Sequence, residues 1–191
     1  MIAMSLEIFF YAVAVVFLAE LGDKTMLATI CLSAQYRRPS VVLLAAMLAL
    51  ATSTVIAVII GVILASTLPL DLILYLAGAL FLLMGGYTLA ISHRTEAVDC
   101  ANPTTFGGMF SLVFIAELGD KTQIAALALA AQSEAPLFVF AGALLGFLLV
   151  NSLGVVAGDM IAERTPIVWI KRVTGLLFIV FGLLSLFGII S

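Results

Sequence analysis

The six residues Glu20-Leu21-Gly22-Asp23-Lys24-Thr25 occur a second time, unchanged, as Glu117-Leu118-Gly119-Asp120-Lys121-Thr122. The second copy follows the first by 97 residues, and both copies lie within strongly apolar stretches. Ionisable side chains at membrane depth are costly and commonly mark the path of a substrate or an ion. This duplicated motif therefore guides the prediction of both fold and function.

The composition is that of an integral membrane protein. Of 191 residues, 64% are hydrophobic and 10% are charged, and the mean hydropathy is +1.32. Soluble domains average about 25% charged residues. The apolar runs are continuous, without the alternation of a β-barrel strand, and a helical span needs about 20 residues. We expect an all-α polytopic protein whose partners are the lipid bilayer and a small solute, with no nucleic acid.

Polar breaks that contain or adjoin proline divide the chain into six apolar segments. Proline commonly stops or starts a helix, so these breaks mark helix ends. The predicted transmembrane helices cover residues 5–33, 40–66, 71–91, 106–131, 137–161 and 167–190.

The similarity between the two halves extends beyond the motif. Residues 16–28 and 113–125 agree at ten of thirteen positions, and four further positions repeat at the same spacing without a gap. These are the pairs Gly61 and Gly158, Gly78 and Gly175, Phe81 and Phe178, and Gly85 and Gly182. The sequence therefore predicts two repeats of three helices, at 1–91 and 106–191, joined by a cytoplasmic linker at 92–105.

The number of helices in each repeat determines their relative orientation. Because three is odd, the second repeat must enter the membrane from the side opposite to the first, which gives an inverted repeat. Secondary transporters commonly have this architecture and bind their substrate near the midplane where the repeats meet.

Basic residues predict which side faces the cytoplasm. The loops and helix ends on one face carry six Lys or Arg residues, and the opposite face carries none. Cytoplasmic loops are enriched in these residues. We therefore expect a multi-pass protein of the inner (cytoplasmic) membrane with both termini outside the cytoplasm. The six residues are Arg37, Arg38, Arg94, Arg164, Lys171 and Arg172.

The repeated motif supplies a set of oxygen ligands. If one copy forms a helical turn, Glu20 and Asp23 share a face of that helix. Inverted symmetry brings the second copy opposite the first. The predicted site then contains four carboxylates and two hydroxyl groups, from Glu20, Asp23, Glu117, Asp120, Thr25 and Thr122.

Charge counting leaves room for a cation in this site. Lys24 and Lys121 can balance two of the four carboxylates, and a divalent cation would balance the rest. Hard oxygen ligands suit Mg²⁺, Ca²⁺ and Mn²⁺. Without a cation, desolvation and mutual repulsion favour protonated carboxyl groups, so cation and protons would compete. The alternative is that Glu20–Lys24 and Glu117–Lys121 are ion pairs that only pack helices, which leaves both aspartates unexplained.

The residue after the motif differs between the repeats. Met26 could offer a thioether ligand that favours Mn²⁺, and Gln123 could offer an amide oxygen. Ordinary packing and an interhelical hydrogen bond are the respective alternatives. Thr54 and Asn151 occupy matching positions in the second and fifth predicted helices. Their side chains could hold the cation ligands in position, or simply form hydrogen bonds between helices.

The two cysteines show no functional pattern. Cys31 and Cys100 lack the spacing of a metal site or of a disulfide framework. We expect Cys31 to be a small apolar packing residue and Cys100 to be a loop thiol.

The pattern Glu-x-Gly-Asp-(Lys/Arg)-(Thr/Ser), once in each of two three-helix repeats, resembles the family of the eukaryotic Golgi Mn²⁺/Ca²⁺–proton exchangers and bacterial manganese exporters. Both copies here match it at every defined position. The resemblance implies that Glu20, Asp23, Glu117 and Asp120 coordinate the cation. It also implies a divalent cation/H⁺ antiporter, which is neither an enzyme nor the carrier of a tightly bound cofactor. The compact chain looks like the manganese-export branch, which implies outward movement of Mn²⁺.

Other functions stay open at this stage. A Ca²⁺/H⁺ antiporter of the same architecture and a passive divalent-cation channel would use similar ligands. An exporter of organic solutes would need aromatic or neutral polar groups in place of four acids, and a membrane scaffold would tolerate neutralised motifs. The sequence does not indicate an oligomer.

Overall fold

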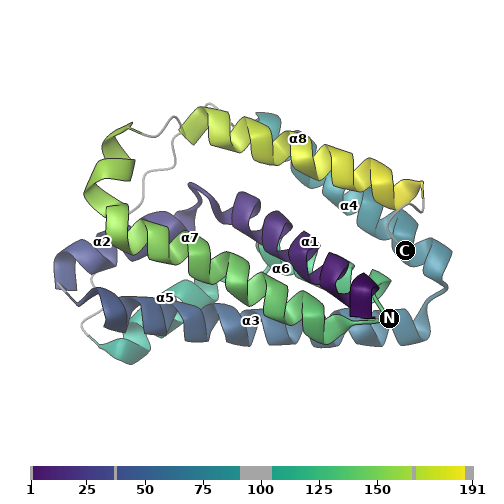
Figure 1. The fold of residues 1–191 in the computed structure, drawn as a ribbon, viewed down its shortest axis with the longest axis horizontal. Coiled ribbons are helices and arrows are strands. Elements are labelled where there is room, and N and C mark those ends of the chain that lie inside the picture. Colours follow the sequence, from purple (N-terminus) through teal and green to yellow (C-terminus); the bar gives the residue numbers. More distant parts are fainter. Residues whose placement is uncertain (1, 37, 91–104, 165–166, 188–191) are drawn as a thin grey trace.

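The structure is a computed structural model that describes residues 2–36, 38–90, 105–164 and 167–187. Within these residues every regular element is a helix, and the elements form an elongated bundle (Figure 1). The helices are α1 (Ile2–Glu20), α2 (Lys24–Tyr36), α3 (Pro39–Thr67), α4 (Leu70–Ala90), α5 (Phe106–Glu117), α6 (Lys121–Gln132), α7 (Pro136–Arg164) and α8 (Ile167–Leu186).

Local sequence explains where several helices begin. Proline stands in the first turn of α3 and at the start of α7, where its missing N–H would have no helical partner anyway. Thr105 precedes α5, and its Oγ1 accepts a hydrogen bond of 3.1 Å from the backbone N–H of Gly108. The predicted helix starts near Pro39 and Pro136 are confirmed.

Two of the six predicted helices are broken at the repeated motif. The breaks separate α1 from α2 and α5 from α6, and the first pair is bent by 70°. The motif glycines Gly22 and Gly119 have φ angles of 75° and 77°. Glycine adopts this left-handed conformation without the steric penalty of a side chain, so the backbone can turn at both motifs. The predicted helices 5–33 and 106–131 are therefore each interrupted at the motif.

Three helices of the described chain, α3, α4 and α7, are long and apolar enough to cross a membrane. The bent α1–α2 pair makes a fourth candidate if its two parts form one span. Helix α5 and the Arg172–Leu186 part of α8 are apolar but shorter. The protein is therefore a multi-span membrane protein with three or four candidate spans, and the six-span inverted repeat stays a prediction.

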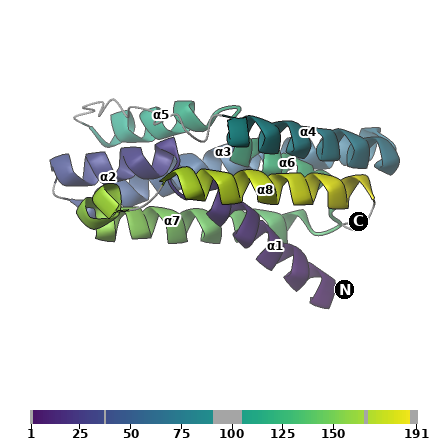
Figure 2. The ribbon, with the colours of Figure 1, turned by 90° about the horizontal axis from the view of Figure 1, so that it is seen from above.

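Helices from the two halves pack against each other in corresponding ways. Helix α1 packs on α7, and its counterpart α5 packs on α3. The α1–α2 and α5–α6 pairs run in opposite directions along the molecule (Figure 2). Buried apolar residues from α1, α3, α5 and α7 form one shared cluster, so the ends of the two broken helices are held by a common core. Its members are Val16, Ala46, Ala49, Leu50, Val113, Ala143 and Phe147.

Helices α4 and α8 lie side by side in both views (Figures 1 and 2). A Cβ atom added to Gly85 would lie 2.7 Å from the carbonyl oxygen of Gly175, and one added to Gly182 would lie 2.9 Å from that of Gly78. Larger residues would therefore push the two helices apart. The repeated glycines therefore permit close packing of the two helices.

One cysteine differs from expectation. Cys31 in α2 takes part in a disulfide bond. The prediction that it is only an apolar packing residue was wrong, and Cys100 lies outside the described residues.

Candidate cation site

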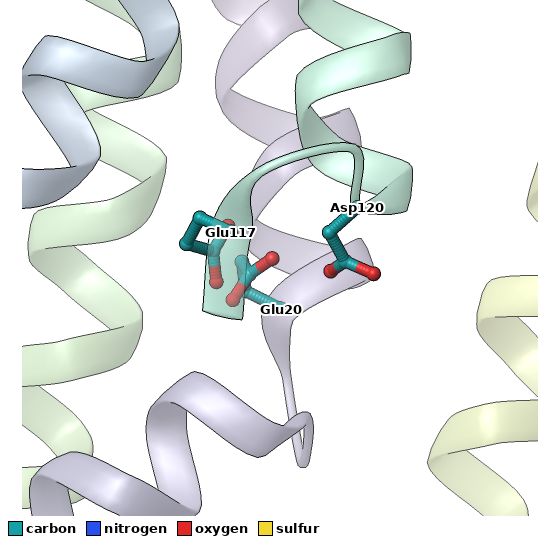
Figure 3. Close-up of side chains that lie close together, drawn as sticks. All are labelled: Glu20, Glu117 and Asp120. Carbon is teal, nitrogen blue, oxygen red and sulfur yellow. The ribbon is translucent and has the colours of Figure 1, made fainter. Parts of the chain in front are cut away.

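Three carboxyl groups meet where the two broken helices face each other. Glu20 is the last residue of α1, Glu117 is the last residue of α5, and Asp120 directly precedes α6. Their side chains converge on one region (Figure 3), and one oxygen of each lies within 4.8 Å of the others. We call these three residues the acidic cluster. The predicted meeting of the two motif copies is thus seen for these three carboxylates.

The two glutamates of the acidic cluster are equally buried but differently bonded. Glu20 is 0% exposed and Glu117 is 2% exposed. The hydroxyl of Thr25 donates to Oε1 of Glu117, and the hydroxyl of Thr122 donates to Oε2 at 3.2 Å. Neither oxygen of Glu20 has a hydrogen-bond partner among the described residues. An ionised carboxylate buried without a partner is unfavourable by several kcal/mol, so Glu20 is the group most in need of a ligand.

The fourth predicted carboxylate is held by a lysine from the other half. The ammonium group of Lys121 forms ion pairs with Asp23 and, at 3.2 Å, with Asp120. Asp23 therefore lies beside the acidic cluster, linked to it through Lys121. Lys24, the counterpart of Lys121, is exposed at the start of α2. Among the described residues, ion pairs with motif carboxylates are seen for Lys121.

The cluster is closed on one side and partly open on the other. Thr25 and Thr122 are buried with Glu20 and Glu117. The side chain of Asp120, by contrast, is 25% exposed. Of the three carboxyl groups, that of Asp120 is therefore partly accessible to solvent, and those of Glu20 and Glu117 are not.

Met26 and Gln123 both bond back to their own motif. The Sδ atom of Met26 lies 3.3 Å from the backbone nitrogen of Gly22, and the Oε1 atom of Gln123 lies 2.6 Å from that of Gly119. The side-chain nitrogen of Gln123 also donates to Ser53 of α3, at 3.1 Å to its hydroxyl. Each atom predicted as a cation ligand thus accepts a hydrogen bond from a motif glycine.

Thr54 and Asn151 bond to neighbours outside the acidic cluster. The hydroxyl of Thr54 donates to the carbonyl oxygen of Leu50 in its own helix, at 2.7 Å. The amide oxygen of Asn151 lies 3.1 Å from the hydroxyl of Thr29, which also lies 2.8 Å from the carbonyl oxygen of Met26. Asn151 therefore links α7 to the first turns of α2.

Two polar residues near the first break were not singled out from the sequence. Thr29 links α2 to α7, and Thr174 of α8 donates to the carbonyl oxygen of Leu18 at 2.7 Å. That carbonyl is near the end of α1, where the last carbonyl groups have no N–H partner within the helix. The available signal was a threonine in an otherwise apolar helix, since such residues commonly hydrogen-bond between membrane helices.

Comparisons with known proteins identify the family of this chain. The family model described as "Divalent cation/proton antiporter GDT1" matches residues 8–96 and 105–190, which together make up most of the chain. A Vibrio cholerae protein named "Putative manganese exporter" is 34% identical over 92% of this chain and 88% of its own length. A Synechocystis GDT1-like protein is 33% identical over 87% of this chain and 90% of its own length.

A Saccharomyces cerevisiae protein named "Divalent cation/proton antiporter GDT1" is 38% identical over a shorter region, 41% of this chain and 28% of its own length. No solved structure matches the chain. The family match covers both repeats and includes both copies of the motif. This chain therefore belongs to the GDT1 family of divalent cation/proton antiporters.

Proposed function

We propose that this protein exports Mn²⁺ in exchange for protons, and that Glu20, Glu117 and Asp120 bind the cation. The observation that carries the proposal is the state of Glu20, which is fully buried while both of its oxygens lack a hydrogen-bond partner in the described part of the chain. Buried polar groups are normally satisfied, and an exception calls for an explanation such as an ion. A cation bound between the three carboxylates supplies the missing partner.

The balance of charge supports a divalent cation. Four carboxylates of the two motifs lie at or beside the site, and Lys121 pairs with two of them, Asp23 and Asp120. The four ionised groups would exceed the one positive charge of Lys121 by three. A cation of charge two offsets most of the excess, and a proton on one carboxylate offsets the remainder.

The remaining motif residues have supporting roles in this proposal. Thr25 and Thr122 each donate to one oxygen of Glu117 and so fix the direction of its carboxyl group. Lys121 pairs with Asp23 beside the site, where this aspartate can replace Asp120 as a ligand when the motifs move. Lys24 is exposed at the surface in this conformation.

Exchange follows from competition for the same oxygens. Protons that bind the carboxylates release the cation, and a cation that binds expels the protons. The opposite directions of the two broken helices support an inverted repeat of six spans, in which rocking of one repeat on the other exposes the site alternately to the two sides. The burial of both glutamates supports an exchanger with a closed site over a passive channel with an open path. We place the protein in the inner membrane with both termini outside the cytoplasm, as the basic loops indicate.

Mn²⁺ is proposed over Ca²⁺ because the manganese-exporter relative aligns with nearly the whole chain. The ligands themselves leave Ca²⁺ as a second candidate, because carboxylate and hydroxyl oxygens suit both ions. The relative named a divalent cation/proton antiporter supports the exchange with protons in either case.

Purified protein in liposomes provides the test. Internal pH is recorded while Mn²⁺, Ca²⁺ or Mg²⁺ is added outside, and the wild type is expected to release protons with Mn²⁺ giving the largest signal. Glu20→Gln and Asp120→Asn should each abolish it. Glu134→Gln, which changes an exposed acid outside the motifs, is the matched control and should behave as wild type. Unchanged coupling in Glu20→Gln would contradict the proposed site, and flux without proton movement would contradict antiport.

A further inference from the structure

The residue directly after each motif makes the same contact in both halves. Met26 and Gln123 are the second residues after Lys24 and Lys121, in the first turns of α2 and α6. Each side chain reaches back to the backbone N–H of the glycine four residues earlier. Those glycines, Gly22 and Gly119, are the residues at which the helices break.

This contact satisfies a group that the helix break leaves without a partner. In a continuous helix the N–H of Gly119 would donate to the carbonyl four residues earlier. Because α5 ends at Glu117 and Gly119 turns with a positive φ, that hydrogen bond is lost. Oε1 of Gln123 replaces the missing acceptor at 2.6 Å. An unpaired backbone N–H in an apolar medium would cost several kcal/mol, so the replacement stabilises the break.

The other end of the Gln123 amide is bonded to the opposite repeat. Its Nε2 atom donates to the hydroxyl of Ser53 at 3.1 Å and lies 3.4 Å from the carbonyl oxygen of the same residue. Ser53 is buried in α3. One amide group therefore connects the loop between Glu117 and Asp120 to a long helix of repeat one.

Met26 makes only half of this connection. A thioether sulfur is a weak acceptor and has no hydrogen to donate. On the side facing the other repeat, Met26 contacts Gly154 of α7, where an added Cβ atom would lie 3.2 Å from its Cγ. The repeat-one break is therefore held against α7 by an apolar contact, whereas the repeat-two break is held to α3 by hydrogen bonds.

We propose that Gln123 is a positioning residue that fixes Glu117 and Asp120 by tying their loop to Ser53, rather than a ligand of the cation. Both ends of its amide are already engaged, the oxygen by Gly119 and the nitrogen by Ser53. Two of the three carboxylates of the acidic cluster flank the loop that this amide holds. Gln123 thus acts on the cation through the placement of these ligands. The transport readout of this proposal rests on the function proposed above, but the contact itself does not.

Amide hydrogen exchange of the segment 118–121 tests the contact directly. Gln123→Leu removes both hydrogen bonds and Ser53→Ala removes the hydroxyl contact from the other side. Each variant should speed exchange in this segment by roughly tenfold, the effect of losing about one hydrogen bond. The double variant should exchange no faster than Gln123→Leu, because both changes break one connection. Thr52→Val is the control, because Thr52 is an exposed residue of the same helix whose hydroxyl bonds to Leu48 of that helix.

Transport then separates positioning from ligation. Positioning predicts that Gln123→Leu and Ser53→Ala both lower the maximal rate and leave the ratio of Mn²⁺ to Ca²⁺ transport unchanged. Gln123→Glu keeps the oxygen that accepts from Gly119 and loses the N–H that donates to Ser53. It should therefore transport faster than Gln123→Leu, and it serves as the test variant if Gln123→Leu folds poorly. A changed ion ratio in Gln123 variants, with normal exchange of 118–121 and a silent Ser53→Ala, would overturn the proposal. Absence of coupled transport in the wild type would instead count against the proposed function, while the exchange experiment would still test the contact.

Discussion

The two motifs share all six residues and the same backbone break, yet their side chains have different partners. Glu117 accepts hydrogen bonds from two threonines, while Glu20 has no partner among the described residues. Lys121 pairs with two aspartates, while Lys24 is exposed. The local sequence determines the break. The surrounding helices determine what each copy of the motif does, so equal residues of the two copies should respond differently to substitution.

The largest contrast is expected between the two glutamates. Glu20→Gln and Glu117→Gln should both reduce Mn²⁺ transport by roughly 100-fold or more, since each removes a charged oxygen ligand. Without cation, the two substitutions should change the melting temperature in opposite directions. Glu20→Gln removes a buried carboxyl group that has no partner among the described residues and should raise the melting temperature, whereas Glu117→Gln loses one of two hydroxyl bonds, about 1 kcal/mol, and should lower it. Thermal unfolding in a chelator measures both, and a lower melting temperature for Glu20→Gln would contradict the difference seen here.

A smaller contrast is expected between the lysines. Lys121→Met removes ion pairs to Asp23 and Asp120 and leaves partly buried carboxylates unpaired, so transport should fall by roughly 10- to 100-fold. Lys24→Met changes an exposed charge, and exposed ion pairs contribute only about 0–1 kcal/mol, so its effect should stay within about fivefold. Initial rates in liposomes compare the two variants. Equal losses would show that both lysines enter the site during transport, and the asymmetry would then describe one conformation only.

The smallest effect is expected at the carbonyl side of the first break. Thr174→Val removes the hydroxyl that donates to Leu18 and leaves a partly buried carbonyl without that bond. A loss of about 1 kcal/mol should lower the melting temperature by about 2–4 °C. Ser66→Ala, which removes an exposed hydroxyl from α3, is the control and should leave the melting temperature unchanged. A Thr174→Val variant as stable as wild type would show that α8 does not hold this break.

Much of the fold follows from the sequence because its signals are local or strictly repeated. Prolines mark the starts of α3 and α7, and the 97-residue spacing predicts which halves correspond. The conflict between glycine and a continuous helix was visible in the motif itself. Its resolution as a break in both copies required the structure, since glycine permits either outcome.

The site could be predicted only to the level of residue types that come together. Repeat symmetry treats Thr25 and Thr122 as equivalent and would send one hydroxyl to each glutamate, but both bond to Glu117. The choice depends on how the halves are offset in space, which a sequence spacing does not record. For the same reason the partners of Met26 and Gln123 were not predictable, because a side chain that could bind a cation could equally bind a nearby N–H.

Binding of Mn²⁺ to the purified protein shows whether Glu20 is a ligand of the cation. Isothermal titration calorimetry on wild type, Glu20→Gln and the exposed-site control Glu134→Gln compares the ligands without any assumption about transport. The account predicts saturable binding to wild type and control, and a loss of affinity of roughly 100-fold or more in Glu20→Gln. Equal affinity in all three proteins would mean that the unpartnered carboxylate of Glu20 is not where the cation binds.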